Sequence, residues 1–237
     1  MELLYNSPCF IINLDRCPER YEYAFENIKK AGFTVIQRFR GVDAKNDDLK
    51  EEWKKHGDPI FDKGDTEFDV YTGKQGCMLS HLNLWKKMID DKIEIATVFE
   101  DDVRFHKDWE KLAPAYFKIT PGDFNLLYLG GQIDHFIEGH VIMTPTFCTH
   151  SYTITLAGAT KLYKLVTRCP HGVRTIDCML LDVMKQVLMN KISGFIWYVW
   201  NGTYFPDPFA TADPDWAKRN TGLVFQDPKF ISDVRIW

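Results

Sequence analysis

The first forty residues combine continuous apolar runs with one helical repeat. Residues 9–14 form a short, nearly continuous apolar run, which is typical of a strand covered on both faces. Apolar residues then recur at helical spacing from Pro18, which a first helical turn tolerates, until Gly32, where the helix should stop. Residues 33–39 have the pattern of a second strand. This strand, helix and strand predict an α/β fold with a mainly parallel central sheet and flanking helices.

The rest of the chain continues this alternation. Met78, Leu82, Trp85 and Ile89 lie at i, i+4, i+7 and i+11, a spacing that predicts a helix after Gly76. Further strands are predicted at 95–99, 124–129, 141–143, 151–156 and 192–200, and further helices at 107–118 with a kink at Pro114, at 158–166 and at 176–188.

Two segments lack a clear period. Residues 43–69 carry mixed charge, with a short helix expected around 49–55, and this pattern predicts a solvated excursion or, alternatively, a mobile lid. Beyond Asn201 the chain is rich in Pro, Gly, Asp and aromatic residues, which favours a long ordered tail or lid over a separate domain. We therefore expect one domain over residues 1–237.

Composition narrows the class of protein. The chain is 45% hydrophobic and 26% charged, as in soluble globular proteins, and its net charge of −4 predicts no general affinity for nucleic acid. The amino terminus lacks the pattern of a secretory signal, and the apolar run at 195–200 is too short to span a membrane, so a cytoplasmic protein is expected. The six cysteines include no C-x-x-C pair and are expected to be reduced and mostly buried.

The stretch IATVFEDDVRF, residues 95–105, ends an apolar strand in three carboxylates, Glu100, Asp101 and Asp102. Alternate side chains on a strand share a face, so Glu100 and Asp102 are expected on one side and Asp101 on the other. Two buried carboxylates on one side repel each other unless a cation joins them, and Mg²⁺ or Mn²⁺ suits oxygen ligands. The acids also follow the carboxyl end of a strand, where open α/β sheets bind ligands. Alternatively, they simply begin a solvated turn or cap the next helix.

A second polar group, in INLDRCPER, follows the first strand at its carboxyl end. Asn13, Arg16 and Arg20 stand there, and arginines in this position can hold a diphosphate or a carboxylate through bidentate contacts. Arg16 and Arg20 are also four residues apart, so they can instead pair with acidic residues on the same helix surface.

Three segments taken together, FIINLDRCPERY, GCMLSHLNLW and VFEDDV, resemble glycosyltransferase family 25 in their order and approximate separation. That family includes lipopolysaccharide-type sugar transferases and the collagen glycosyltransferases that modify hydroxylysine. The resemblance is looser in the second half, where it rests on LYLGG, SYTITLAGATKLYKLV, TIDCMLLDV and VFQDPKFISDV. It implies a type-A glycosyltransferase fold, in which a Rossmann-like nucleotide-sugar-binding half, 1–132, merges with an acceptor-binding half and tail, 133–237.

The resemblance also implies a divalent metal, Mn²⁺ or Mg²⁺, with Asp102 as its direct ligand, Glu100 as a further ligand, and Glu100 or Asp101 contacting ribose or water around the metal. Glu100 departs from the usual Asp-x-Asp form of the motif. Many such enzymes add a late histidine ligand, but the last histidine here is His171, so either an acid near Asp213 or phosphate and water would complete the site. The donor-binding residues that the resemblance implies are Asn13, Leu14, Arg16, Arg20, Asp43, Ser80, His81, Glu100, Asp101, Gly130, Gly131 and Gln132.

Asp177 is the candidate catalytic base, because an acceptor hydroxyl must give up its proton and Asp177 opens a predicted helix. The apolar face of that helix, Ile176, Leu180, Val183 and Val187, would anchor it. The alternative is that Asp177 only stabilises the first helical turn. The family resemblance implies a direct displacement with inversion at the anomeric carbon.

Several of these residues also have purely structural explanations. Ser80 can bond its own helix backbone while His81 lies half exposed, and Gly130 and Gly131 can form a tight turn instead of approaching a donor sugar whose hydroxyls Gln132 contacts. Aromatic residues could stack on an acceptor, although most are expected in the core; they are Trp197, Tyr198, Trp200, Tyr204, Phe205 and Trp216.

These features predict a metal-dependent, inverting glycosyltransferase that moves galactose or glucose from a uridine diphosphate sugar. The acceptor would be a hydroxylysine-bearing, collagen-like chain, its galactosylated form, or a growing oligosaccharide. One rival is a haloacid-dehalogenase-like phosphotransferase, but that chemistry needs an aspartate nucleophile where Glu100 stands. The other rival is a sugar- or peptide-binding module whose catalytic site has decayed.

Overall fold

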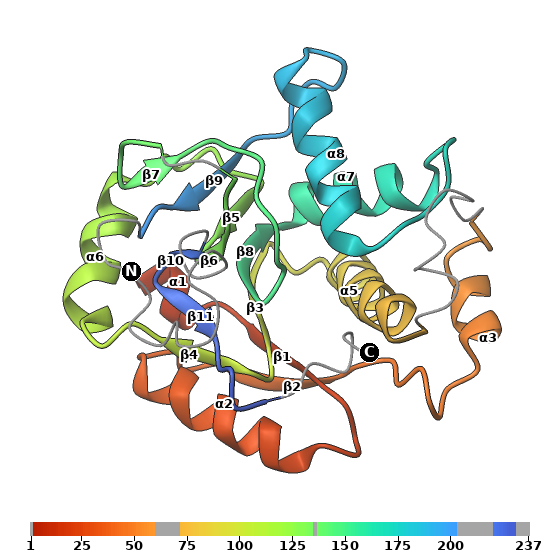
Figure 1. The fold of residues 1–237 in the computed structure, drawn as a ribbon, viewed down its shortest axis with the longest axis horizontal. Helices are drawn as coiled ribbons and strands as arrows, with labels where there is room; N and C mark the ends of the chain where they lie inside the picture. The colour runs from red at the N-terminus through yellow and green to blue at the C-terminus, as the bar shows by residue number, and fades with distance from the viewer. Residues whose placement is uncertain (1, 60–71, 135–136, 203–219, 231–237) are drawn as a thin grey trace.

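The structure is a computed structural model that describes residues 2–59, 72–134, 137–202 and 220–230 (Figure 1). Its helices are α1 (Glu2–Asn6), α2 (Pro18–Lys30), α3 (Leu49–Lys54), α5 (Thr72–Asp90), α6 (Trp109–Ile119), α7 (Leu156–Thr167) and α8 (Ile176–Leu188). Its strands are β1 (Cys9–Asn13), β2 (Ile36–Arg40), β3 (Ile95–Glu100), β4 (Val103–Phe105), β5 (Leu126–Tyr128), β6 (Gly130–Gln132), β7 (Val141–Ile142), β8 (Ser151–Thr155), β9 (Trp197–Trp200), β10 (Asn220–Gly222) and β11 (Val224–Gln226).

Seven strands form a central sheet in the order β2-β1-β3-β8-β5-β9-β7. β1 is parallel to both β2 and β3, and β5 is parallel to β9. β8 runs antiparallel between β3 and β5, and β7 is antiparallel to β9. The predicted α/β class is confirmed, but the sheet is mixed, because the described chain between β5 and β8 contains no helix to return it to the opposite end of the sheet.

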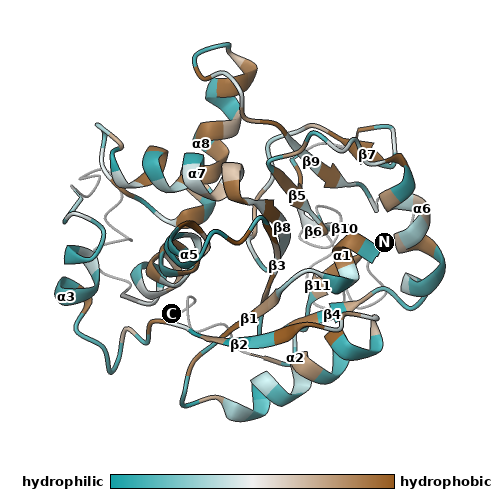
Figure 2. Cartoon of the chain, turned by 180° about the vertical axis from the view of Figure 1, so that it is seen from behind, coloured by the Kyte–Doolittle hydropathy of each residue, from teal (hydrophilic) through white to brown (hydrophobic). Residues whose placement is uncertain are grey.

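The two faces of the sheet bury separate hydrophobic clusters, as the alternation of side chains along a strand requires. On β1, Phe10 and Ile12 belong to one cluster, whereas Cys9 and Ile11 belong to the other. Helices α5, α7 and α8 contribute to the first cluster, and α2 and α6 contribute to the second. Figure 2 shows the hydrophobic residues concentrated along the sheet, with hydrophilic residues on outlying elements such as α3.

Most predicted elements appear, and local signals explain where their ends differ. α7 begins at Leu156 because the Thr155 side chain caps it by accepting a hydrogen bond from the Gly158 amide. The strand expected from residue 192 begins only at Trp197, because Gly194 has a positive φ of 70° and turns the chain before it. α6 contains Pro114 within its length.

Parts of the two aperiodic segments lie outside the described residues. The short helix expected around 49–55 is α3, but residues 60–69 are not described. After residues 203–219, which are also not described, β10 pairs with β6 and β11 pairs with β4. Among the aromatic candidates, Trp197 and Trp200 are buried and Tyr198 is half-buried, whereas Tyr204, Phe205 and Trp216 lie outside the described residues.

Two whole-chain expectations can be compared with the structure. All six cysteines are free, with Cys9 and Cys17 buried and the other four half-buried. Within the described ranges, no helix combines the length and the apolar character needed to cross a membrane.

Candidate active site

A pocket lies at the carboxyl ends of β1 and β3. The two parallel strands are in register, with Ile12 beside Glu100, so the residues that follow each strand meet at this edge of the sheet. The pocket brings together both predicted metal ligands and all the predicted donor-binding residues except Gly130, Gly131 and Gln132. Its lining residues are Ile12, Asn13, Leu14, Arg16, Arg20, Val42, Asp43, Ala44, Lys45, Gly73, Cys77, Ser80, His81, Glu100, Asp101 and Asp102.

The acidic trio divides between two groups of partners. Asp101 pairs with Arg20 and accepts a hydrogen bond of 2.7 Å from the Asn13 amide, and the Arg20 guanidinium also lies 3.2 Å from Asp102. Glu100 instead lies against His81. The expectation that Asp101 would point away from Asp102 is therefore wrong. β3 ends at Glu100, and Asp101 and Asp102 form a turn, so the alternation of a strand does not apply to them.

The pKa values of the carboxyl groups in this cluster do not all shift in the same direction, because their neighbours differ. Burial, together with the nearby charges of Glu100 and Asp101, raises the pKa of Asp102 to about 8 against the opposing effect of Arg20. Burial would also raise the pKa of Glu100, but the neighbouring His81 lowers it below its ordinary value. The Oδ1 atom of Asp102 is buried and has no hydrogen-bond partner among the described residues. A cation is the kind of ligand that would satisfy this oxygen.

Ser80 and His81 project from α5 toward the strand ends. The Ser80 hydroxyl donates to the Gly76 carbonyl at 2.7 Å, as its structural explanation predicts, and accepts from the Val42 amide at 2.8 Å. Gly76 allows this contact, because a Cβ atom there would lie 2.7 Å from the Val42 carbonyl oxygen. His81 is only 1% exposed, so the alternative explanation, in which this histidine lies half exposed, is wrong.

His81 is held from its far side by residues that sequence reasoning missed. Its Nδ1 atom lies 2.8 Å from the Tyr152 hydroxyl, which also accepts a hydrogen bond of 3.0 Å from the Trp85 indole. Thr149 donates to Glu100 at 3.0 Å. Tyr152 and Thr149 come from the antiparallel β8 and the segment before it, so the inserted strand supplies the supports of His81 and Glu100.

The predicted arginines pair across the pocket. Arg16 Nε lies 2.9 Å from Asp43, which follows β2, while Arg20 reaches the turn after β3. These ion pairs connect the two arginines to other elements of the fold. Leu14 lines the same pocket beside them.

Residues 227–230 support the acidic turn, which consists of Asp101 and Asp102. Sequence reasoning also missed this support. The Asp227 amide donates to the Asp102 carbonyl at 2.6 Å, and the Asp227 carboxylate accepts a hydrogen bond from the Tyr23 hydroxyl. The Phe230 ring lies beneath the Arg20 guanidinium at 5.2 Å. The only sequence signal for these contacts is the closing segment VFQDPKFISDV, which contains both Asp227 and Phe230.

Asp177 opens α8, whose apolar face packs in the core as predicted through Ile176, Leu180 and Val183. Burial and, to a smaller extent, the charge of Glu100 raise the pKa of Asp177 to about 7, against the opposing effect of a hydrogen bond from the Cys148 amide. Its Oδ1 atom is buried without a hydrogen-bond partner among the described residues. A carboxyl group in this condition can accept a proton near neutral pH.

Gly130, Gly131 and Gln132 form β6 rather than a tight turn, and they do not line the pocket described above. A Cβ atom on Gly130 would collide with the Val224 carbonyl oxygen at 1.8 Å, so this glycine is explained by the close approach of β11. The Gln132 amide donates to Asn220 at 2.9 Å. A role of these three residues toward a donor sugar stays a prediction.

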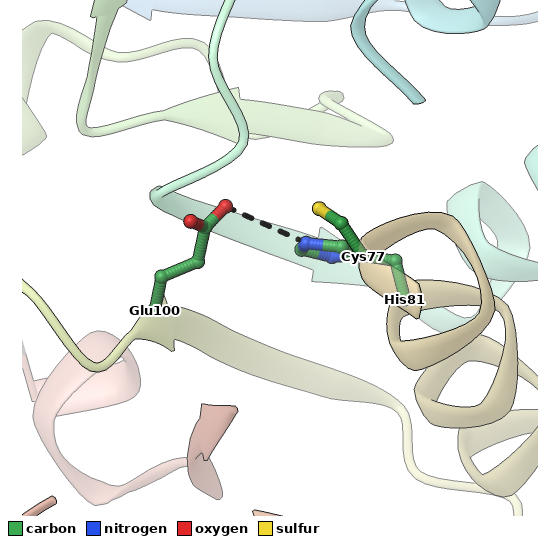
Figure 3. Close-up of side chains that lie close together, drawn as sticks. All are labelled: Cys77, His81 and Glu100. Atoms are coloured by element: carbon green, nitrogen blue, oxygen red, sulfur yellow. Dashed lines mark ion pairs between the residues drawn. The ribbon is translucent and has the colours of Figure 1, made fainter. Parts of the chain in front are cut away.

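A further group of potential ligands lies on the inner wall of the pocket. Ligand atoms of Cys77, His81 and Glu100 all lie within 4.8 Å of one another (Figure 3). His171, the last histidine of the chain, is exposed and does not line the pocket, and Asp213 lies outside the described residues. The histidine that lies beside the acidic trio is therefore His81 of α5 and not the last histidine of the chain.

Comparison with known proteins adds independent findings. A family model described as glycosyltransferase family 25 (LPS biosynthesis protein) matches residues 6–145. A glycosyltransferase 25 family member of Aedes aegypti is 30% identical over 66% of this chain and 28% of its own length. Procollagen galactosyltransferase 2 of Mus musculus is 29% identical over 77% of this chain and 30% of its own length.

Two other similar proteins are a curated relative and a solved structure. The inactive glycosyltransferase 25 family member 3 of Mus musculus is 27% identical over 79% of this chain and 33% of its own length. The chain thus spans about a third or less of these curated relatives. A glycosyltransferase involved in the glycosylation of the major capsid of PBCV-1 has a crystal structure that covers 96% of this chain and 95% of its own, with 9% identity and a TM-score of 0.47.

Proposed function

Because this chain belongs to glycosyltransferase family 25, we propose that it is a metal-dependent, inverting glycosyltransferase that transfers a hexose from a uridine diphosphate sugar to an acceptor hydroxyl. The observation that carries the proposal is the pocket at the ends of β1 and β3. It gathers four carboxylates and two arginines, the residue types that a nucleotide diphosphate and its metal require.

The chain's residues fit a hard divalent cation, Mn²⁺ or Mg²⁺. Asp102 and Glu100 would hold it, with Asp101 contacting ribose or water, because the cluster carries more acidic groups than Arg20 alone neutralises. Such an ion, when bound, neutralises charge that develops on a departing diphosphate. The buried and unsatisfied Oδ1 of Asp102 supports this assignment.

The remaining pocket residues would bind and orient the donor. Arg16 and Arg20 supply guanidinium groups for the diphosphate, and Asn13 orients Asp101 through its amide. Ser80 fixes the loop after β2 through Val42, so that Asp43 is held at the pocket wall. A rigid wall of this kind lowers the entropic cost of ordering a long nucleotide-sugar.

Asp177 would act as the base. The acceptor oxygen forms its bond to the anomeric carbon as the bond from that carbon to the diphosphate oxygen breaks, and the hydroxyl proton passes to the Asp177 carboxylate. The pKa of about 7 supports this role, because the carboxylate is then present at neutral pH and is still basic enough to take a proton. A single displacement of this kind inverts the anomeric configuration.

The donor sugar would be galactose or glucose. Relatives named procollagen galactosyltransferases support a hydroxylysine-bearing, collagen-like acceptor, with its galactosylated form or an oligosaccharide as alternatives. A second candidate function is a sugar- or peptide-binding module without catalysis, because some relatives are named inactive or probable inactive. The acidic trio of this chain favours the enzyme.

The proposal is tested by a screen of nucleotide-sugars with Mn²⁺ that reads the release of free nucleotide, with and without collagen-like peptides. We expect release from a uridine diphosphate hexose that requires the metal. Acceptor binding in calorimetry, combined with no affinity for uridine diphosphate, would support the binding module instead.

A further inference from the structure

The inner wall of the pocket presents three ligand types that differ from those of the acidic turn. Cys77 and His81 lie four residues apart on α5, so their side chains share one face of the helix. Glu100 projects toward them from the end of β3, and Figure 3 shows the thiol, the imidazole and the carboxylate directed toward one another. The group therefore combines one sulfur, one nitrogen and one oxygen ligand.

The distances suit a shared ion better than a direct hydrogen bond. His81 Nε2 lies 3.6 Å from Glu100 Oε1, beyond the usual hydrogen-bond distance of about 2.7–3.2 Å. Zn–N and Zn–O bonds of about 2.0–2.2 Å at a tetrahedral angle separate the two ligand atoms by about 3.4 Å. The observed separation is close to this value, and all three ligand atoms lie within 4.8 Å of one another.

The state of His81 gives a second, independent indication. Its Nε2 atom is buried, is directed at Glu100, and has no hydrogen-bond partner among the described residues. Its other ring nitrogen lies 2.8 Å from the Tyr152 hydroxyl, a contact that fixes the orientation of the ring, as the second contacts of metal-bound histidines do. A metal on Nε2 requires the tautomer with the ring proton on Nδ1, and in that tautomer the Nε2 lone pair faces Cys77 and Glu100.

We propose that Cys77, His81 and Glu100 form a binding site for a soft divalent cation of the Zn²⁺ type. Thiolate and imidazole ligands favour Zn²⁺, whereas Mg²⁺ and Mn²⁺ favour carboxylate and water. Binding places the thiol proton of Cys77 in solvent and leaves a fourth coordination position toward the pocket. This site stands on its own ligands and goes beyond the proposed transferase function.

One consequence does rest on the proposed function. Glu100 would belong both to this site and to the oxygen site of the acidic turn, so occupation by Zn²⁺ would exclude Mn²⁺. Cation binding is therefore measured without any nucleotide, and a failure of the soft-metal site is distinguishable from a failure of the transferase proposal.

The test titrates Co²⁺ into the reduced, metal-free full chain and records the absorption spectrum. We expect thiolate-to-cobalt absorption that saturates at one equivalent and disappears when Zn²⁺ is added. Cys77→Ser should abolish this absorption, whereas Cys169→Ser, which changes another half-buried cysteine, should retain it. Co²⁺ binding without thiolate absorption, or absorption that survives in Cys77→Ser, would overturn the proposal.

Two further measurements keep the proposal testable if Cys77→Ser fails to fold. In the wild-type chain, Zn²⁺ should protect Cys77 but not Cys169 from alkylation, as read by mass spectrometry, and equal labelling of both would contradict the site. Tyr152→Phe should weaken Zn²⁺ binding by about 10–100-fold, because second contacts of metal-bound histidines have effects of this size. Unchanged Zn²⁺ affinity in this variant would contradict the assigned role of His81.

Discussion

The pocket has two walls that shift the pKa values of neighbouring carboxyl groups in opposite directions. On the arginine wall, formed by Asn13, Arg20, Asp101 and Asp102, burial raises the pKa of Asp102 to about 8 despite the adjacent guanidinium. On the imidazole wall, formed by Cys77, His81 and Glu100, the histidine outweighs the effect of burial and lowers the pKa of Glu100. The difference shows that an acidic run in a sequence is not one electrostatic unit, because the end of a strand can distribute its members between different partners.

The largest expected effect comes from replacing Asp102, the proposed metal ligand on the arginine wall. Asp102→Asn should abolish Mn²⁺-dependent donor hydrolysis and transfer, because it removes the proposed metal ligand while preserving the side chain's size. Its thermal transition should stay nearly unchanged, since the carboxyl group lost was itself buried and incompletely satisfied. Full activity in this variant would remove the metal assignment from Asp102.

The next effect concerns a residue on neither wall. Asp177→Asn should lower turnover by about 10²–10⁴-fold, the range for loss of a general base, while leaving the affinity for the donor nearly unchanged. Initial-rate kinetics over a range of donor concentrations separate the two parameters. A lower melting temperature with normal turnover would instead show that Asp177 only stabilises the start of α8.

A smaller effect should follow from replacing Arg20, the positively charged side chain of the arginine wall. Arg20→Gln should weaken binding of uridine diphosphate by about 10–100-fold, because a charge-assisted contact contributes about 1.5–3 kcal/mol. The control is Arg40→Gln, which removes an exposed guanidinium paired with Asp15 and Asp47 outside the pocket. Equal nucleotide affinity in the two variants, measured by calorimetry, would show that Arg20 serves only as the partner of the acidic turn.

The smallest effect tests the connection between α5 and the loop after β2. Ser80→Ala should reduce the free energy of unfolding by about 1–3 kcal/mol, because the buried Val42 amide loses its acceptor. Thr34→Ala is the control, since its hydroxyl makes its hydrogen bonds on an exposed surface. If urea denaturation gave the same loss for both, the Ser80 contact would have no special structural weight.

The sequence predicted those features that depend on local repeats. The apolar run of β1 and the helical spacing of α5 were recognisable because each element buries one period of side chains in the core. The pocket residues of the first half could be grouped because parallel strands end at one edge of a sheet.

Features that depend on distant partners could not be predicted from the sequence. Tyr152 meets His81 across 71 positions of the chain, and Asp227 meets Tyr23 across 204, so no local pattern connects them. The antiparallel β8 and the turn at Asp101 were missed for a related reason. A strand pattern specifies neither the direction of a strand nor the residue at which the backbone turns.

The central claim is that Asp102 and Glu100 bind a cation that in turn binds a diphosphate. Its most direct test is calorimetric titration of uridine diphosphate into the wild-type chain, with Mn²⁺ and with a chelator, and into Asp102→Asn. We predict binding in the wild type with Mn²⁺, and a strong loss of binding both with the chelator and in the variant. Equal affinity under all three conditions would contradict the claim.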